Sequence, residues 1–300
     1  MRTGKLSKVH EPSLARSWLF APGDSERKMA KALGGEADRI ILDLEDAVAL
    51  EVKPLARDLV RAFLEAHRDD AARLWVRINP LDGEEALRDL AAVMSGRPGG
   101  IMVPKVSGRT DIERLDRYLE ALEVAHGIAP GATPVLALVT ETAQGMFHCG
   151  DYLGAPRLVG MTWGAEDLAD ALGASVNTGP DGAYGFTYQM ARSFCLLGAA
   201  AAGVTPIETI CADFRDLDAL AARAQAVRRE GFRGMLAIHP AQVPVINAAF
   251  SPSADDIAEA REIVDLFAAN PGKGTLAWRG GMVDRPWLAR AQRTLQQAGL

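Results

Sequence analysis

The sequence predicts an α/β protein folded as a (β/α)8 barrel with a C-terminal helical extension. Short apolar, β-branched runs alternate with longer amphipathic stretches, and eight such repeats occupy about 235 residues, the usual length of this barrel. The runs are continuously apolar, which is typical of parallel strands covered on both faces. They are Ser17–Phe20, Arg39–Leu44, Leu74–Ile78, Gly100–Val103, Pro134–Val139, Arg157–Thr162, Thr205–Ile210 and Gly234–Ile238.

Amphipathic segments between these runs predict the helices of the barrel. An open, doubly wound sheet is the alternative, but it normally has fewer strands and a glycine-rich phosphate loop after the first one. No G-x-G-x-x-G or G-x-x-x-x-G-K-[ST] motif occurs in the chain. Helices are expected at Ser25–Leu33, Pro54–Arg68, Glu84–Met94, Asp111–His126, Asp216–Arg229 and Ala241–Ala249.

The pattern changes after Phe250. Ser251-Pro252-Ser253 indicates a break and an N-cap for a helix at Asp255–Ala268, and a turn follows at residues 270–274. We therefore expect a catalytic barrel domain at residues 14–250. Residues 251–300 form the helical extension, which we expect to act as a lid or as an oligomer arm.

Composition excludes several classes of protein. The 300 residues include 33 basic and 39 acidic ones, a net charge of −6, which argues against nucleic-acid binding and against a polybasic membrane anchor. Cys149, Cys195 and Cys211 are scattered, so neither a disulfide framework nor a zinc site is indicated, and we expect buried, unreactive thiols. The N-terminus lacks the apolar core of a signal peptide, and no apolar stretch is long enough to span a bilayer. We expect a cytoplasmic protein.

Polar residues directly follow the predicted strands, where barrels of this kind carry their chemistry. Glu141 and Asp167 are the best candidates for metal ligands, because two carboxylates with open remaining positions suit Mg²⁺. The alternative is that Asp167 is a helix N-cap and Glu141 a first-turn acid.

Arg77 lies inside the apolar run LWVRINP, where an unpaired guanidinium would be costly to bury. Its partner is either a substrate carboxylate, which we favour, or a structural acid such as Glu45. Among Asp43, Glu45 and Asp46, we expect one to orient Arg77 or a metal-bound water, while the others cap a helix or bind a neighbouring group.

Two further features have functional and structural interpretations. Lys28 and Lys31 lie on one face of the first predicted helix and could bind phosphate groups, although a solvated surface explains them equally well. His239 ends the last predicted strand, and it is as easily a hydrogen-bonded structural histidine as a catalytic one.

Eight motifs, in order, resemble the citrate lyase β-subunit-like family, which includes malyl-CoA and citramalyl-CoA lyases. The resemblance runs from Arg16 to about Ala291. It implies a (β/α)8 barrel that assembles as homotrimers or hexamers, and a Mg²⁺-dependent carbon–carbon lyase acting on a 2-hydroxy-acid thioester. The motifs are RSWLFAPGDSERKMAKAL, DRIILDLEDAV, VRINP, VPKV, ETAQG, GAEDL, AIHPAQ and GGMVDRP.

The resemblance also implies roles for individual residues. Glu141 and Asp167 match the Mg²⁺ ligands, and Arg77 matches the arginine that holds the keto or hydroxy acid. Asp284 matches an aspartate that the tail presents to a neighbouring subunit's site. The CoA phosphates would contact Arg16, Lys28 and Lys31.

We assign catalytic roles to Asp284, Arg77 and Glu45, with Asp284 as the acid–base group of an enclosed site. The alternative for Asp284 is that it only caps the final helix. For the whole protein, the alternatives are a CoA-independent aldolase that releases pyruvate, a thioester hydrolase acting at the same site, and a non-catalytic subunit.

Overall fold

The computed structural model of the chain describes residues 15–180 and 182–300. The chain separates into two compact units that divide between Ile246 and Asn247. Residue 14, the predicted start of the barrel domain, lies outside the described residues. So does the N-terminal segment that lacks a signal-peptide core.

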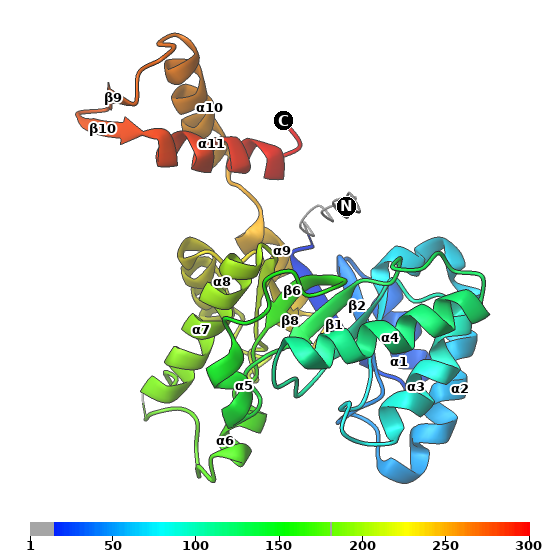
Figure 1. Cartoon of the computed structure of the whole chain (residues 1–300). Helices are drawn as coiled ribbons and strands as arrows, with labels where there is room; N and C mark the ends of the chain where they lie inside the picture. The colour runs from blue at the N-terminus through cyan, green and yellow to red at the C-terminus, as the bar shows by residue number, and fades with distance from the viewer. Residues whose placement is uncertain (1–14, 181) are drawn as a thin grey trace, which may run out of the picture. The chain divides into compact units, whose positions relative to one another are not determined.

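The first unit is a closed barrel of eight parallel strands, in which each strand pairs with the next and β8 pairs with β1 (Figure 1). This confirms the predicted (β/α)8 fold, and every predicted run contains a strand whose ends differ from the prediction by at most two residues. The strands are β1 (Ser17–Pro22), β2 (Arg39–Asp43), β3 (Leu74–Arg77), β4 (Gly100–Val103), β5 (Val135–Leu138), β6 (Leu158–Thr162), β7 (Thr205–Glu208) and β8 (Gly234–Ala237).

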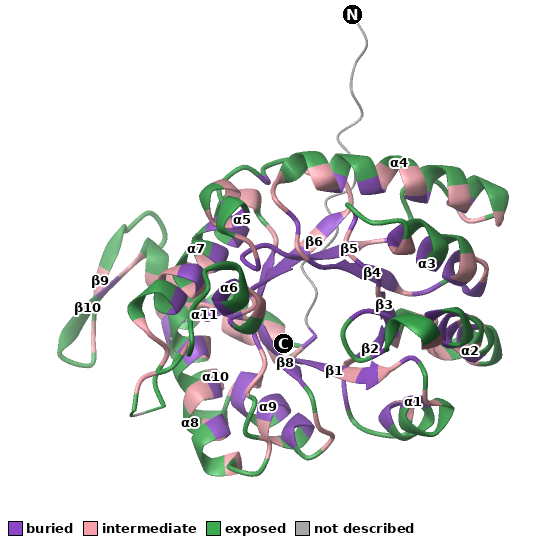
Figure 2. Cartoon of the chain, turned by 90° about the horizontal axis from the view of Figure 1, so that it is seen from below, coloured by how far each residue is buried: buried purple, intermediate pink, exposed green. Residues whose placement is uncertain are grey.

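Helices surround the strands, so that the strands are buried while the outer helix faces are exposed (Figure 2). The predicted helices are present, but the sequence analysis did not predict α5, α6 or α7. Within the described residues, no helix is both long and apolar enough to cross a bilayer. The helices are α1 (Glu26–Leu33), α2 (Lys53–Ala66), α3 (Glu85–Val93), α4 (Arg109–Ala125), α5 (Ala143–His148), α6 (Glu166–Ala171), α7 (Phe186–Ala202), α8 (Leu217–Glu230) and α9 (Gln242–Phe250), with 3₁₀ helices at Leu50–Val52, Arg68–Arg73 and Met94–Gly96.

The register of the first three strands places two opposite charges side by side. Pro22 of β1 pairs with Asp43 of β2, and Asp43 pairs with Arg77 of β3. Because all the strands are parallel, the residues that end them and the loops that follow lie at one end of the barrel. This end therefore gathers the polar residues that the sequence singles out.

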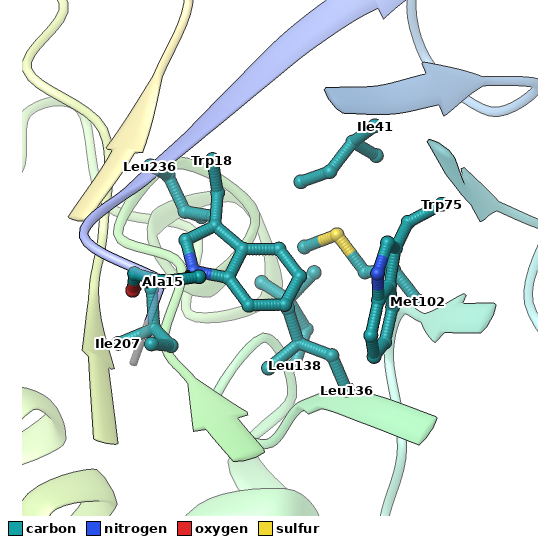
Figure 3. Packing of buried hydrophobic residues seen from close by; sticks show 9 residues of the cluster. All are labelled: Ala15, Trp18, Ile41, Trp75, Met102, Leu136, Leu138, Ile207 and Leu236. Carbon is teal, nitrogen blue, oxygen red and sulfur yellow. Dashed lines mark hydrogen bonds between the residues drawn. The ribbon is translucent and has the colours of Figure 1, made fainter. Parts of the chain in front are cut away.

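An apolar cluster fills the interior of the barrel (Figure 3). The Trp18 and Trp75 rings pack edge to face with centroids 4.9 Å apart. Gly100 makes room for them, because a Cβ at this position would lie 2.5 Å from the Trp75 ring. Leu138 and Leu236 belong to this cluster and also line the cavity at the carboxyl end of the strands, so the core forms the floor of that cavity.

The second unit packs two helices, α10 (Ala254–Ala268) and α11 (Arg285–Gln297), with a hairpin of β9 (Thr275–Trp278) and β10 (Gly281–Asp284). Ser253 caps α10 as predicted, in a capping box whose partner is Asp256. The hairpin was not predicted. The unit's small apolar core consists of Ala260, Ile263, Phe267, Val283 and Ala291.

Candidate functional site

A cavity of about 390 Å³ opens where the barrel strands end. It brings together the candidate metal ligands Glu141 and Asp167 with Arg77, as the sequence analysis expected. Its other lining residues are Phe20, Pro22, Asp43, Asp46, Ala47, Leu138, Gly164, Ala165, Glu166, Tyr184, Thr209, Ile210, Leu236 and Ile238.

Glu141 is buried in the short segment between β5 and α5. Helix α5 begins at Ala143 and is capped by Thr142, whose side chain accepts a hydrogen bond from the Gly145 N–H at 2.9 Å. Glu141 therefore precedes the helix and is not the first-turn acid of the alternative interpretation. One of its oxygens, Oε2, accepts a hydrogen bond from the Lys105 backbone N–H at 2.7 Å.

Asp167 is the second residue of α6, and the N-cap of that helix is Ala165. Its carboxylate does not serve as an N-cap; instead, its Oδ1 lies 2.9 Å from the Lys105 ammonium. Gly164, just before the helix, keeps space open beside the other carboxylate. A Cβ at Gly164 would lie 3.1 Å from Glu141 Oε1, so any side chain there would crowd the oxygen that faces the cavity.

The Arg77 guanidinium makes close contacts with Asp43 and Glu45. Its Nε and Nη2 donate to the two oxygens of Asp43, both at 2.7 Å, and its Nη1 lies 2.7 Å from Glu45 Oε2. The two hydrogen bonds to Asp43 use two of the five N–H groups of the guanidinium, and Nη1 also lies 3.7 Å from Asp46 Oδ2. The guanidinium carbon Cζ also lies 4.8 Å from the centroid of the Phe20 ring. Arg77 thus has the structural partners considered above and still lines the cavity, with N–H groups left for a carboxylate ligand.

Glu45 is almost completely buried and joins Arg77 to Lys105. Its Oε1 accepts from the Lys105 ammonium at 2.7 Å. Glu45 is not among the described residues that line the cavity, so the structure places it behind Arg77, where it holds that side chain. Asp46, which is exposed, lines the cavity directly.

Lys105 is the residue that the sequence analysis left without a role. It follows β4 and contacts Glu45, Glu141 and Asp167 at once. Its backbone has φ 52°, in the left-handed region that favours glycine. Its position in the sequence could have identified Lys105 as a candidate, because it directly follows a buried strand, as several acids of the site do.

Burial and neighbouring carboxylates raise the pKa of Glu141. Burial raises the pKa of Glu141 to about 8, and the charges of Glu45 and Asp167 act in the same direction. Burial also raises the pKa of Glu45, although Arg77 and Lys105 oppose it. A cation placed against Glu141 and Asp167 would relieve this repulsion.

Magnesium fits this donor set. Mg²⁺ prefers oxygen ligands and is usually held by one or two carboxylates, with water and substrate completing the octahedron. Glu141 and Asp167 are two carboxylates on one cavity, with space preserved by Gly164. In the part of the chain that the structure describes, no group of three or more Asp, Glu, His or Cys side chains is placed to hold a metal ion.

Lys53 fixes the loop that carries Glu45. Its buried ammonium donates to the carbonyl oxygens of Leu44 and Glu45, at 2.8 and 3.0 Å, and to Asn79 Oδ1 at 2.6 Å. Asn79 is held in turn by Asp89, whose Oδ2 accepts from both its backbone and its side-chain N–H groups. The Lys53 ammonium therefore makes hydrogen bonds to backbone carbonyl groups in the loop after β2, in place of the hydrogen bonds of a helix or strand.

Lys53→Met is expected to destabilise the protein by about 2 kcal/mol, because buried Asn79 Oδ1 loses its donor and the carbonyl oxygens of Leu44 and Glu45 each keep only one of two donors. Denaturant unfolding measures this loss. Arg61→Met, which removes an exposed cation from the same helix, is the control and should cost far less. Wild-type stability of Lys53→Met would contradict the assigned role.

A second cavity, of about 450 Å³, adjoins the first and is basic. Arg27, Lys28 and Lys31 line it, and Phe20, Pro22 and Ile238 line both cavities. The two lysines predicted to bind phosphate therefore lie next to the acidic site.

His239 also lines the basic cavity. Its ring stacks on Phe214 with centroids 4.8 Å apart, and its Nδ1 accepts from the Ala241 N–H at 3.2 Å. The structural interpretation of this histidine thus has direct partners.

Arg16 is not brought to this end of the barrel. It precedes β1 and forms hydrogen bonds to both carboxylate oxygens of Asp38, which precedes β2, so it lies at the amino ends of the strands. Its expected contact with CoA phosphates beside Lys28 and Lys31 is corrected accordingly. A residue before a barrel strand and a residue after it lie at opposite ends of that strand.

Two other residues at strand ends, Glu208 and Asp284, are not among the described residues that line the cavity. Glu208 at the end of β7 is fully buried and pairs with Arg223 at 2.8 Å. Asp284 belongs to the second unit, where it ends β10 and caps α11 by accepting from the Trp287 N–H at 3.3 Å. Tyr184, from the loop before α7, lines the cavity without having been predicted.

The cysteines behave largely as expected. Cys149 and Cys195 are buried, and burial raises the pKa of both thiols, which makes them unreactive. Cys211 is half-buried.

Comparisons with known proteins identify the family of the chain. A family model described as HpcH/HpaI aldolase/citrate lyase matches residues 16–240. A (3S)-malyl-CoA thioesterase of Cereibacter sphaeroides is 36% identical over 97% of this chain and 96% of that protein. A citrate lyase subunit beta-like protein of Mycobacterium tuberculosis is 36% identical over 94% of this chain and 95% of its own.

Solved structures show the same likeness. CitE from Mycobacterium tuberculosis in complex with magnesium, acetoacetate and coenzyme A superimposes with a TM-score of 0.79 at 35% identity. The match covers 95% of this chain and 98% of that chain.

Proposed function

Since the chain belongs to the HpcH/HpaI aldolase/citrate lyase family, we propose that it is a Mg²⁺-dependent lyase that cleaves or forms a carbon–carbon bond in a 2-hydroxyacyl-CoA. The products of cleavage are an acyl-CoA and an α-keto acid. The observation that carries the proposal is the adjacency of the two cavities, one acidic with Arg77 and one basic with Lys28 and Lys31. A keto acid fits the first, and the phosphates of CoA fit the second.

The shared wall of the two cavities supports a CoA substrate over the CoA-free aldolase alternative. Phe20, Pro22 and Ile238 line both cavities, so a ligand that enters between them reaches basic groups on one side and carboxylates on the other. A small hydroxy keto-diacid would use only the first cavity. The relative solved with magnesium, acetoacetate and coenzyme A is consistent with this arrangement.

In the proposed mechanism, Glu141 and Asp167 would hold Mg²⁺, which when bound would supply Lewis-acid stabilisation of negative charge on oxygen. Arg77, fixed by Asp43 and Glu45, binds the carboxylate of the keto acid and orients its reacting carbonyl. Glu45 acts through Arg77 and is a positioning residue.

Proton transfer is the role proposed for Asp284. In cleavage, a base removes the hydroxyl proton, the carbon–carbon bond breaks, and the thioester enolate is protonated at carbon. In condensation, a base removes a proton from the α-carbon of the thioester, and the enolate attacks the keto acid held by Arg77. We propose that the protein is a homotrimer or hexamer in which Asp284 serves a neighbouring subunit's site.

Hydrolysis of the thioester is the second candidate function. The Cereibacter sphaeroides relative named as a (3S)-malyl-CoA thioesterase favours it. The same carboxylates and Arg77 would bind the acyl group, but water would attack the thioester carbonyl and release CoA as a thiol.

A panel of malyl-, citramalyl- and citryl-CoA with Mg²⁺ separates these functions. A lyase releases glyoxylate, pyruvate or oxaloacetate together with an acyl-CoA, and it frees no thiol. A thioesterase frees CoA thiol and an intact hydroxy acid. Free thiol without any keto acid would replace the lyase proposal by the thioesterase, and turnover of neither kind would remove both.

Asp284→Asn is expected to lower turnover by about 10²–10⁴-fold while the fold is retained, because asparagine caps a helix as well as aspartate does. Steady-state kinetics and thermal unfolding measure the two effects. Asp265→Asn, an exposed change on α10, is the control. Full activity of Asp284→Asn would leave the residue with capping alone.

Mixing Asp284→Asn with Arg77→Ala protein under conditions of subunit exchange tests the proposed location. Some sites would then contain both intact groups, and part of the activity should return. Proven exchange without recovery would place Asp284 in its own subunit's site.

A further inference from the structure

Lys105 holds the carboxylates at which the proposed function seats a metal. Its ammonium lies 2.7 Å from Glu45 Oε1 and 2.9 Å from Asp167 Oδ1, and Asp46 Oδ2 is 4.0 Å away. Its backbone N–H donates to Glu141 Oε2 at 2.7 Å. One residue thus contacts both proposed metal ligands, one through its main chain and the other through its side chain.

The two contacts have different consequences for a metal. The hydrogen bond from the backbone N–H orients the Glu141 carboxylate and leaves Oε1 beside the space that Gly164 keeps open. The ammonium, in contrast, shares Asp167 with any cation that binds there. Two cations cannot both lie within contact distance of one carboxylate oxygen without repulsion.

The Lys105 side chain can move away from Asp167. Glu45 Oε1 is the nearer of its two partners, and the Lys105 side chain is partly exposed, so it can swing from Asp167 while it keeps Glu45. Glu45 itself is fixed by Arg77 on its other oxygen. The ammonium can therefore leave Asp167 without leaving a buried carboxylate uncompensated.

We propose that Lys105 is a tethered competitor of the metal: its ammonium pairs with Asp167 until Mg²⁺ displaces it, and so it sets the Mg²⁺ affinity of the site. This inference rests on the proposed function, in that Glu141 and Asp167 are the ligands. Lys105 is thus a positioning residue whose main chain and side chain have opposite effects on metal binding. The main chain prepares one ligand, and the side chain opposes occupation of the other.

The strained backbone of Lys105 supports a selected role for its side chain. Glycine adopts φ 52° at the lowest conformational energy, because it has no Cβ to clash in this region. A lysine here keeps the strain and adds the ammonium. Its contacts to two acids from β2–α2 and β6–α6 account for retaining it.

Lys105→Met tests the proposal by calorimetric titration with MgCl₂ in the absence of substrate. The variant keeps the backbone N–H to Glu141 and removes only the ammonium, so the dissociation constant for Mg²⁺ should fall by about tenfold. Lys105→Gly, which also relieves the left-handed backbone, should give the same direction. Arg117→Met, which removes an exposed positive charge on α4, should leave the affinity unchanged.

Thermal unfolding supplies a second readout. Without added Mg²⁺, Lys105→Met should melt about 2–4 °C below wild type, because Glu45 and Asp167 lose the ammonium. The fall should be smaller in Lys105→Gly, which gains from relief of the left-handed backbone. Saturating Mg²⁺ should raise their melting temperatures by more than it raises that of wild type.

Unchanged or weaker Mg²⁺ binding in both Lys105 variants would overturn the proposal. If Glu141→Gln and Asp167→Asn meanwhile abolish binding, the metal site stands and only the role of Lys105 is lost. If Mg²⁺ binding survives in those two variants, the ligand assignment fails, and the inference fails with it.

Discussion

Glu141→Gln and Asp167→Asn are each expected to reduce turnover by at least about 10³-fold, through loss of the metal that stabilises developing charge. Both substitutions nearly preserve shape while removing one of the two carboxylates, proposed here as metal ligands, that line the cavity. Mg²⁺ affinity, measured by calorimetry, should be lost together with turnover in both variants.

The Glu141→Gln substitution should preserve or raise thermal stability, although it lowers turnover. Burial and neighbouring carboxylates raise the pKa of Glu141 to about 8, so folding at neutral pH must either take up a proton there or bury a charge, and a neutral amide removes this cost. Glu141→Gln should therefore melt at or above the wild-type temperature while it fails to bind Mg²⁺. Asp170→Asn, one turn further along α6 and exposed, is the control for Asp167. Near wild-type turnover at low Mg²⁺ in either ligand variant would refute the assignment of that residue.

Arg77→Lys should lower kcat/KM by about 10²–10³-fold with little change in CoA affinity. Lysine keeps the charge but loses the planar fork that meets Asp43 with two hydrogen bonds of 2.7 Å and Glu45 with a third contact. The carboxylate of the keto acid would then meet a single, misplaced ammonium. Steady-state kinetics with varied keto acid in the condensation direction measures this loss.

Arg157→Lys separates the structural from the functional part of this effect. Arg157 is a buried arginine that pairs with both oxygens of Glu123, and it precedes β6, so it is away from the cavity. Its loss should lower stability and leave kcat/KM unchanged. If Arg77→Lys behaves in the same way, Arg77 is only a structural partner of its acids.

The barrel could be predicted because burial on both faces leaves a direct trace in the sequence. Each strand is a continuous apolar run, and the alternation with amphipathic segments counts the repeats. The hairpin of the second unit left no such trace. Its strands are four residues each and are joined by Arg279-Gly280, which is not one of the strong hairpin signals.

The candidate site was predictable where its residues end strands or follow them closely. Arg77 ends β3 and Glu141 follows β5, and their meeting in one cavity follows from parallel strands alone. Lys105 also follows a strand, but its role depends on a left-handed backbone and on acids from two other loops, neither of which is visible in a linear sequence. Tyr184 comes from a long loop whose course no periodicity defines.

The double duty of Leu138 and Leu236 constrains how this enzyme can acquire new substrates. Both side chains pack in the barrel core and also face the cavity, so enlarging the cavity through them would create voids in the core and lower stability. Ala47 and Tyr184 line the same cavity from loops. Divergence in substrate preference should therefore accumulate at such loop positions, while the two leucines change only alongside compensating mutations.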